Sequence, residues 1–280
     1  MLLRRLACAT LVCLLATAIW AKDKVTIKSL IAKSDAVYYT PAAHGLNDLA
    51  VDFVVKELAD DPVGKNAAIT YYYAGGSRRR LNVANIPDAQ ARYQQLLMDL
   101  LSPLGQYVVP VSSTETFSGM TLKINTVNRL LLGVPGTTFY EIVASVPGNL
   151  SPFTKYAVLL DKDGFLHQIE YTLTDNTVTT ASMENINVKD GAWLFSVVNT
   201  HIALKDADMW MIFHFKYDTI EGFILPTQCT VQFRNAMNKP IEARPDYTVD
   251  FKNYRLNKGI AAAAITESEK KSTATTTPAP

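Results

Sequence analysis

Residues 156–173 read YAVLLDKDGFLHQIEYTL, and this stretch decides the fold. An apolar run precedes the tetrapeptide DKDG at 161–164, and a run in which apolar and polar side chains alternate follows it. DKDG is a strong turn sequence between antiparallel strands. Alternation with a period of two places every second side chain on one face of a sheet. The stretch therefore predicts a β-hairpin with one apolar face.

The same period of two continues through the second half of the chain, where tight turns separate short runs. The predicted strands comprise residues 140–146, 156–160, 165–173, 178–188, 195–203, 209–217, 223–233 and 247–251. Two earlier strands are predicted at 67–74 and 120–125. Strands at this spacing form an antiparallel meander. We therefore predict an α+β protein that is mostly antiparallel β.

Two other stretches have helical spacing. Between Leu46 and Leu58 apolar residues recur every three or four positions, and DDPVG at 60–64 ends the pattern. The second stretch begins near Pro87, which suits the first turn of a helix, and it continues to Leu101. We predict two amphipathic helices, each of which buries one face.

Three residues around the second helix predict its ends. Asn85 is suited to the N-cap position, because its side-chain oxygen accepts a hydrogen bond from a free backbone N–H. Pro103 and Gly105 are expected to end the helix soon after residue 101.

The predicted sheet has a large apolar face that must be covered. A meander of this length must curl, close or be covered, because otherwise its apolar face stays in water. A curled sheet with helices across its opening would enclose an apolar cavity of the kind that holds an acyl chain. The predicted lining consists of Phe53, Leu97, Tyr140, Ile142, Ile169, Tyr171, Phe213, Phe215, Phe223, Leu225 and Val231. Simple core packing is the alternative for most of the aromatic side chains.

The chain begins with the pattern of a secretion signal. Residues 1–5 are basic, residues 6–20 form an uncharged apolar run, and A-x-A-like sites end at Ala18 and Ala21. A membrane anchor is the alternative, but the run is shorter than the ~20 residues that a spanning helix needs. We expect residues 1–21 to be removed and the mature protein, which lacks a lipid-attachment cysteine, to lie in the periplasm.

The expected mature chain is nearly neutral. Removal of residues 1–21 takes away two arginines and no acid, so the formal net charge changes from +1 to −1. This charge gives no electrostatic reason for binding nucleic acid. Cys229 is the only cysteine that remains, so no internal disulfide forms and its thiol is expected to be a small buried group. Residues 22–258 are expected to form a single domain, and residues 259–280 a disordered Thr/Ala/Pro-rich tail.

Sequence motifs for catalysis and metal binding are absent. The chain has no G-x-S-x-G elbow, and its four histidines are widely spaced without an H-E-x-x-H motif. Asp161 and Asp163 resemble part of a calcium-binding turn, but the rest of an EF-hand loop is missing. We predict no metal, no cofactor and no enzymatic activity.

The segment AGGSRRR at 74–80 has two interpretations. It lacks the lysine and hydroxyl order of a phosphate-binding loop, so a hairpin turn with an exposed basic edge is the simpler one. The other interpretation is a contact between Arg78–Arg80 and an anion or lipid headgroup at the mouth of a cavity.

Two late segments carry a family resemblance. A strand begins GFILP at 222–226, and DYTVDFKNYRLN at 246–257 has the form of a closing strand with a final asparagine. With the early helix and the long meander, they resemble the periplasmic lipoprotein carriers of the LolA/LolB-like superfamily, loosely over residues 30–258. The resemblance implies an incomplete β-barrel, or half-barrel, whose concave apolar side is lidded by about two helices and binds acyl chains. The polar segment at 103–118 and the tail depart from that pattern.

These observations leave three functions open. The first is a periplasmic carrier or sensor that reversibly buries the acyl chains of a lipid or lipidated protein, with peripheral contact to a membrane. The second is a non-enzymatic module of the cell envelope that binds a protein partner and has a filled core. The third is an enzyme of unrecognised type, which would require His44, His201 or His214 to cluster with carboxylates. An apolar cavity in the structure favours the first.

Overall fold

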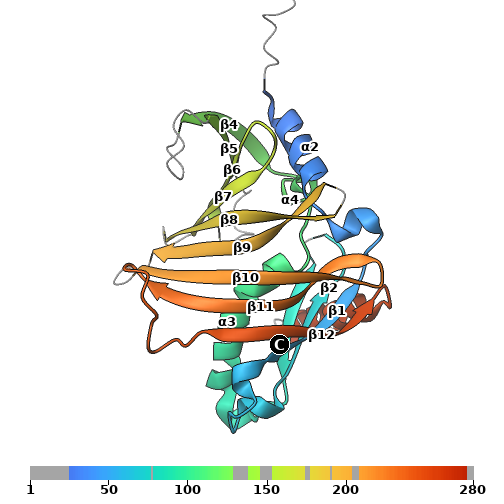
Figure 1. Ribbon diagram of the computed structural model, residues 1–280. Coiled ribbons are helices and arrows are strands. Elements are labelled where there is room, and N and C mark those ends of the chain that lie inside the picture. The colour runs from blue at the N-terminus through green and yellow to red at the C-terminus, as the bar shows by residue number, and fades with distance from the viewer. Residues whose placement is uncertain are drawn as a thin grey trace, which may run out of the picture.

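Twelve strands form one curled antiparallel sheet (Figure 1). The computed structural model describes residues 25–76, 78–128, 138–145, 153–173, 177–189, 191–203 and 208–275. The strands lie in the order β3-β2-β1-β12-β11-β10-β9-β8-β7-β6-β5-β4, so β3 and β4 are the two edges and the sheet does not close. The predicted class, a mostly antiparallel half-barrel accompanied by helices, is confirmed.

The strands from β4 to β12 are a continuous meander. The strands are β1 Leu49–Val55, β2 Ala68–Tyr73, β3 Arg79–Ala84, β4 Thr121–Asn128, β5 Thr138–Ser145, β6 Phe153–Leu160, β7 Leu166–Leu173, β8 Val178–Lys189, β9 Ala192–Ala203, β10 Asp208–Ile220, β11 Phe223–Asn235 and β12 Tyr247–Leu256. Each predicted strand is present within a few residues of its expected bounds. The DKDG turn is also confirmed, since Asp161 and Phe165 pair across it with an N···O distance of 3.0 Å.

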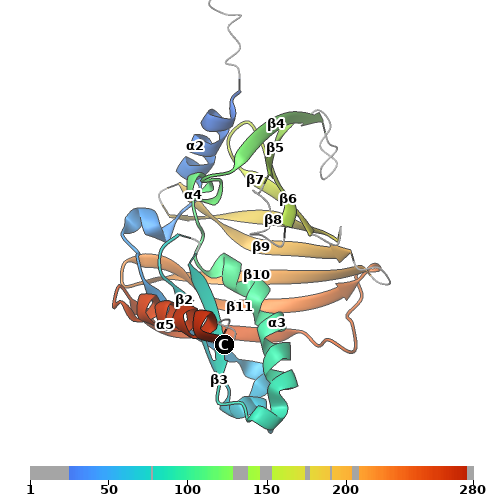
Figure 2. The ribbon, with the colours of Figure 1, turned by 180° about the vertical axis from the view of Figure 1, so that it is seen from behind.

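Within the described residues, four α-helices and four short 3-10 helices accompany the sheet. They are α2 Ile27–Val37, α3 Ala91–Val108, α4 Ser113–Thr116, α5 Ile260–Thr275, η1 Pro41–His44, η2 Lys56–Leu58, η3 Gly64–Asn66 and η4 Asp88–Gln90. Helix α3 connects the hairpin β2–β3 to the meander, and α5 runs across the outer side of β1 and β2 (Figure 2). No helix in the described part of the chain has the length and apolar content to cross a membrane.

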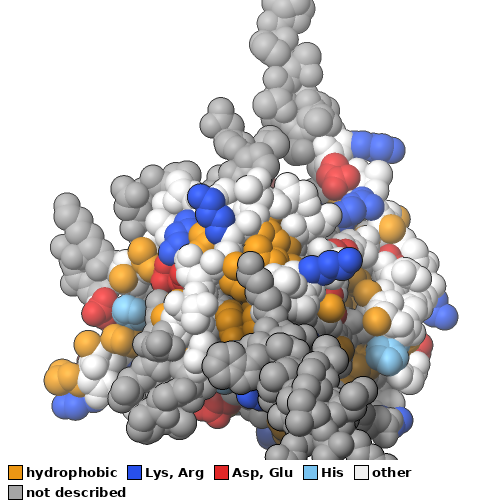
Figure 3. Space-filling view, turned by 90° about the horizontal axis from the view of Figure 1, so that it is seen from above, with side chains coloured by type: hydrophobic (Ala, Val, Ile, Leu, Met, Phe, Trp, Pro, Cys, Tyr) orange, Lys and Arg blue, Asp and Glu red, His pale blue; other side chains and the backbone are white. Residues whose placement is uncertain are grey.

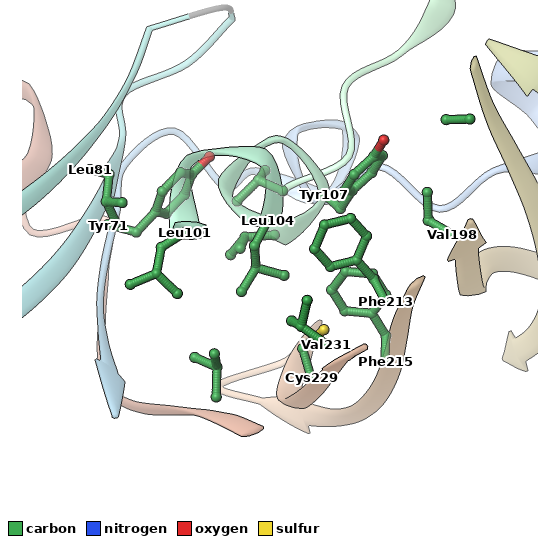
Figure 4. Packing of buried hydrophobic residues seen from close by; sticks show 14 of the residues in the cluster. Tyr71, Leu81, Leu101, Leu104, Tyr107, Val198, Phe213, Phe215, Cys229 and Val231 are labelled. Carbon is green, nitrogen blue, oxygen red and sulfur yellow. The ribbon is translucent and has the colours of Figure 1, made fainter. Parts of the chain in front are cut away.

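The core lies between α3 and the concave face of the sheet. Figure 4 shows Leu101 and Leu104 on α3 pointing toward Cys229 and Val231 of β11, and all four side chains are completely buried. Burial of each large aliphatic side chain stabilises the fold by about 1.5–3 kcal/mol. Cys229 is the small buried group that its strand pattern predicted, and burial raises the pKa of its thiol.

Polar contacts anchor α3 along its whole length. The side chain of Gln94 donates to the Val83 carbonyl of β3 at 2.7 Å, and the Tyr247 hydroxyl of β12 donates to the Leu100 carbonyl at 3.0 Å. At the carboxyl end of α3, Arg79 donates to the carbonyls of Gln106 and Val109. The helix is therefore tied to one edge of the sheet and to its middle.

The prediction of a helix between Leu46 and Leu58 is wrong, because this segment contains β1. Its strand is paired on both sides, with β2 and β12, in a register that places Phe53 opposite Phe251. The inner side chains belong to the core, while Ala50 on the other face is also fully buried. A strand buried on both faces reads as a nearly continuous apolar run, and such a run also satisfies helical spacing.

The first helix of the described chain, α2, was not predicted. It has a local signal, since Thr26 and Ser29 form a capping box in which each side chain accepts from the other residue's N–H at 3.1 Å. Its weak apolar face, with Leu30 as the fully buried side chain, gave no clear helical stripe.

Helix α3 is longer than its sequence predicted, and its cap is a different residue. Its N-cap is Gln90, whereas Asn85 lies before η4 with a left-handed φ of 61°. Pro103 and Gly105 lie inside the helix, which ends at Val108. A Cβ at Gly105 would lie 3.0 Å from the ring of Tyr71, so glycine allows close packing on β2. Packing of the final turn offsets the helix hydrogen bond that proline removes.

The expected disordered tail is wrong for residues 260–275, which form α5. The buried carboxylate of Asp48 accepts a hydrogen bond from the N–H of Ala262 in the first turn at 2.8 Å. Ala261 and Ile265 are buried. Composition alone misses this contact between distant segments. Residues 276–280 and the expected signal at 1–21 lie outside the described residues.

We predict that Leu104→Ala lowers the free energy of unfolding by about 2–5 kcal/mol, because it leaves a cavity between α3 and the sheet. Leu96→Ala on the same helix is the matched control, since the Leu96 side chain is 58% exposed. Urea unfolding followed by circular dichroism measures both variants. Equal losses for the two would contradict the placement of α3.

We also predict that Asp48→Ala loosens α5. The loss of one capping acceptor costs about 1 kcal/mol, so backbone amides in residues 260–270 should exchange faster in hydrogen–deuterium exchange. Asp60→Ala, at an exposed turn residue, serves as the control. Unchanged exchange in α5 after Asp48→Ala would show that this cap does not hold the helix.

Candidate ligand-binding cavity

A cavity of about 930 Å³ lies at the end of the sheet that α3 does not fill. Pockets for small molecules usually have about 300–1,000 Å³. Its wall combines the inner face of β6, β7 and β9 with the end of α2, the turn between β2 and β3, and the segment around α4. Seen from above, the molecule shows hydrophobic side chains in the middle, with basic and some acidic side chains around them (Figure 3).

The register of β6 and β7 arranges the lining in rows. Three facing pairs line the cavity: Tyr156 with Tyr171, Val158 with Ile169, and Leu160 with Leu166. Strand positions two apart share one face of a sheet, and a register shift between Leu159 and Leu160 brings Leu166 opposite Leu160, so these pairs succeed one another along the wall. The cavity therefore changes from aromatic and polar at one end to aliphatic at the other.

Tyr38, which follows α2, closes the aliphatic end. Its hydroxyl accepts from the Leu166 N–H at 2.8 Å and donates to the Asn185 amide oxygen at 3.0 Å. Burial raises the pKa of Tyr38, so the hydroxyl stays protonated. The ring also lies 5.0 Å from that of Phe195, between centroids. This tyrosine fixes the position of β7 relative to α2.

Three tyrosines form the polar end. The rings of Tyr156 and Tyr171 lie 5.3 Å apart, and the Tyr171 hydroxyl lies 3.5 Å from the side-chain oxygen of Gln106. Burial raises the pKa of Tyr171 to about 12 and raises those of Tyr107 and Tyr156 further. All three hydroxyls therefore stay neutral near pH 7 and keep a proton to donate.

Arg79, at the start of β3, reaches the same end. Its guanidinium donates to the carbonyls of Gln106 at 2.8 Å and Val109 at 2.9 Å, at the carboxyl end of α3. A cation is favourable there, because the helix dipole is negative at this end. The buried Nε has no hydrogen-bond partner, and Arg79 forms no ion pair within the described residues. Its positive charge is therefore not neutralised by a neighbouring carboxylate.

A clamp between α2 and α4 covers one side of the cavity. The carboxylate of Asp35 accepts from the N–H groups of Ser113 at 2.5 Å and Thr114 at 3.2 Å, while the hydroxyls of Ser34 and Ser113 lie 3.0 Å apart. The two segments are thus held mainly by polar contacts, and few of their residues belong to the apolar core. Such contacts exchange readily with water, in contrast to the packing beneath α3.

The turn between β2 and β3 forms another side of the cavity. It contains Gly75 and Gly76, both at positive φ, and a Cβ at Gly76 would lie 2.8 Å from a Glu115 oxygen. Arg78 points toward α5, where it contacts Thr266 at 3.2 Å and Glu269 at 3.6 Å. The predicted basic turn is therefore present beside the cavity, with Arg78 and Arg79 in its wall.

The structure brings only part of the predicted lining to this cavity. Ile169 and Tyr171 line it, whereas Tyr140 and Phe223 are half-buried against the core. The remaining predicted residues are buried in the core: Phe53, Leu97, Ile142, Phe213, Phe215, Leu225 and Val231. The reason is that α3 itself occupies the concave face over β10 and β11. Whether any of the predicted residues contacts a ligand stays a prediction.

Several lining residues were not predicted. Tyr107 and Gln106 lie beyond the expected end of the second helix, and Tyr38 follows a helix that was missed. A helical stripe extended through Pro103 would have found Tyr107, since Leu97, Leu101, Leu104 and Val108 continue the same spacing.

The four histidines lie apart from one another and from this cavity. His167 lies 3.0 Å from a carboxylate oxygen of Asp161, and His201 lies 3.3 Å from one of Asp208 and stacks on Trp210. His44 stacks on the ring of Tyr39, and His214 lies 3.3 Å from Gln232. The described residues contain no group of three or more His, Cys, Asp or Glu side chains arranged to hold a metal ion.

Comparison with known proteins gives likeness in fold only. No family model matches the sequence, and no curated protein matches it. Two solved structures are similar. A LolA superfamily protein from Nitrosomonas europaea has a TM-score of 0.32 and 10% identity, over 84% of this chain and 95% of that one. An outer membrane lipoprotein-sorting protein domain from Vibrio parahaemolyticus has a TM-score of 0.33 and 11% identity, over 82% and 92%. At these TM-scores and identities the two likenesses carry no argument about the family or the function of this chain.

We predict that Gly164→Ala destabilises the docking of α2. A Cβ at Gly164 would lie 2.6 Å from the Ser34 nitrogen and 2.7 Å from the Lys33 carbonyl carbon, in addition to the strain at φ 95°. We expect the free energy of unfolding to fall by about 1–3 kcal/mol in addition to the cost of the strained φ. Gly222→Ala is the matched control, since Gly222 has φ 88° and open space around it. Thermal unfolding measures both, and equal losses would contradict the α2 contact.

Proposed function

We propose that this protein is a non-enzymatic carrier or sensor that reversibly buries the acyl chain of a lipid or lipidated protein. One observation carries the proposal: a cavity with an aliphatic wall lies beside a core that is otherwise closely packed. Folded proteins rarely leave such space unfilled, because packing normally reaches the density of organic crystals. A ligand-sized cavity that persists in the fold indicates a binding site.

The aliphatic rows of β6 and β7 suit a chain of methylene groups. Each CH₂ group moved from water into such a site contributes about 0.8 kcal/mol. Val158, Leu160 and Ile169 offer no hydrogen-bonding group from their side chains, so they favour apolar atoms over water. The binding energy would therefore grow with chain length until the row ends near Tyr38.

Access to the cavity would come from movement of the segments that cover it. In the α2–α4 clamp the N–H and hydroxyl of Ser113, the first residue of α4, donate to the carboxylate of Asp35 and the hydroxyl of Ser34. Opening this clamp would expose Leu30 and Phe117, whereas movement of α3 would expose a larger part of the core, including Leu97, Leu101 and Leu104. The proposed ligand route therefore runs between α2 and α4.

The alternative, a protein-binding module with a filled core, has one observation in its favour. Strand β4 is an edge of the sheet, and its free backbone groups offer a place for another strand. Its centre carries the exposed Lys123, a residue type that protects edges from pairing. The cavity favours the carrier, and an envelope protein remains a candidate partner at β4.

The proposed location is the periplasm, after removal of residues 1–21. The carrier would meet its ligand at a membrane surface and would contact that surface only peripherally. Basic side chains around the upper apolar area are consistent with such a contact, because they attract anionic lipid headgroups (Figure 3).

The test is binding of palmitate to protein purified without detergent, first freed of lipid and examined by native mass spectrometry. We predict that Val158→Trp lowers the affinity at least about tenfold, because the indole fills the aliphatic row. Val178→Trp on β8 is the matched control, since Val178 is 37% exposed and does not line the cavity. Absence of saturable binding in the unmodified protein, or equal affinities for the two variants, would exclude an acyl site here.

A further inference from the structure

The polar end of the cavity contains hydrogen-bond donors that the protein does not use. Tyr107 is 6% exposed and lines the cavity, yet its hydroxyl has no hydrogen-bond partner among the described residues. The Thr200 hydroxyl lies close enough to the Tyr107 hydroxyl to lower its pKa, but the two do not reach hydrogen-bond geometry, so Oγ1 of Thr200 is likewise unpartnered. Buried polar groups are normally satisfied, and each exception requires a physical reason. An acceptor supplied by a ligand would satisfy this hydroxyl.

The ring of Tyr107 is held so that the hydroxyl faces away from the core. The ring centroid lies 5.7 Å from that of Phe213 and 6.3 Å from that of Phe215. Figure 4 shows the hydroxyl at the opposite end of the ring from these phenylalanines. The aromatic packing thus fixes one direction for the O–H group, away from the two phenylalanines.

A second unused donor, on Arg79, lies near the same place. Both Arg79 and the Tyr171 hydroxyl bind Gln106, the neighbour of Tyr107, and the Arg79 charge lowers the pKa of Tyr171 against the larger effect of burial. The Nε of Arg79 is buried without a partner, and a guanidinium nitrogen only donates. A positive charge and several donors therefore converge at one end.

The two acidic residues of the cavity wall, Asp35 and Glu115, form no ion pair with Arg79. The carboxylate of Asp35 is occupied by the N–H groups of α4, and Glu115 is exposed beside the turn at Gly76. Arg79 is thus a cation without an ion pair among the described residues, and such a group suits an anion more than a neutral ester or amide.

We propose that Tyr107, Tyr171 and Arg79 form a headgroup subsite for a carboxylate or phosphate at the end of an acyl chain. The chain would then lie along the Val158–Ile169 and Leu160–Leu166 pairs, toward Tyr38. This inference rests on the proposed acyl-binding function and narrows it. The ligand is a lipid with an oxyacid head, in contrast to a lipidated peptide whose ester and amide groups are neutral.

The test compares palmitate with methyl palmitate, which has the same chain without the charge, and with palmitoyl lysophosphatidic acid. We expect both acids to bind at least about tenfold more tightly than the ester. Tyr107→Phe, which removes only the hydroxyl, should lower the affinity for both acids about tenfold and leave the affinity for the ester unchanged. A preference for one acid over the other identifies the headgroup as carboxylate or phosphate.

Tyr71→Phe is the matched control. The Tyr71 hydroxyl is also buried without a partner, but Tyr71 lies on β2 and does not line the cavity. Removing an unpartnered hydroxyl leaves no group unsatisfied, so both variants should fold, as thermal unfolding would verify. Equal binding of acid and ester, or an equal effect of the two variants, overturns the headgroup subsite. If neither the acids nor the ester binds, the acyl-binding function itself is overturned.

Discussion

A single constraint shapes this protein: one curled sheet has a concave apolar face that a single long helix covers only in part. Helix α3 fills the hollow over β10 and β11, where Leu101 and Leu104 pack against Cys229 and Val231. The far end, over β6, β7 and β9, receives no such helix and remains open as a cavity. The division between core and cavity is therefore set by where α3 ends, at Val108.

The end of α3 also determines the chemistry of the cavity. Its last turn presents Gln106 and Tyr107 to the hollow, and its free carbonyls bind Arg79 from β3. The polar end of the cavity thus arises from the same feature that ends the helix, since the final carbonyls of a helix need donors. Beyond that point the sheet wall is formed mainly by the aliphatic side chains Val158, Leu160, Leu166 and Ile169. Along one wall of the cavity, the lining therefore changes from the cationic Arg79 at one end to aliphatic side chains at the other.

Different forces hold the two sides of the cavity. The sheet wall is part of the ladder of backbone hydrogen bonds that runs through all twelve strands. The α2–α4 cover depends on Asp35 and on the close fit of α2 against Gly164. The proposed carrier would need a cover that moves against a rigid wall, and the α2–α4 hydrogen bonds are separate from the packing beneath α3.

The sequence by itself determined the meander, because alternation in residues such as Phe165–Leu173 depends only on which side of a strand faces the core, and DKDG specifies its own turn. It also indicated a curled sheet with an apolar hollow, and a buried Cys229. Tertiary structure decided the rest. Residues 49–55 became a strand because β2 and β12 pair with both of its edges, α3 continued through Pro103 because its last turn is buried, and α5 formed because Asp48 caps it. The cavity residues depend on where α3 ends against the sheet, and that position is set by contacts between distant segments that no local pattern records.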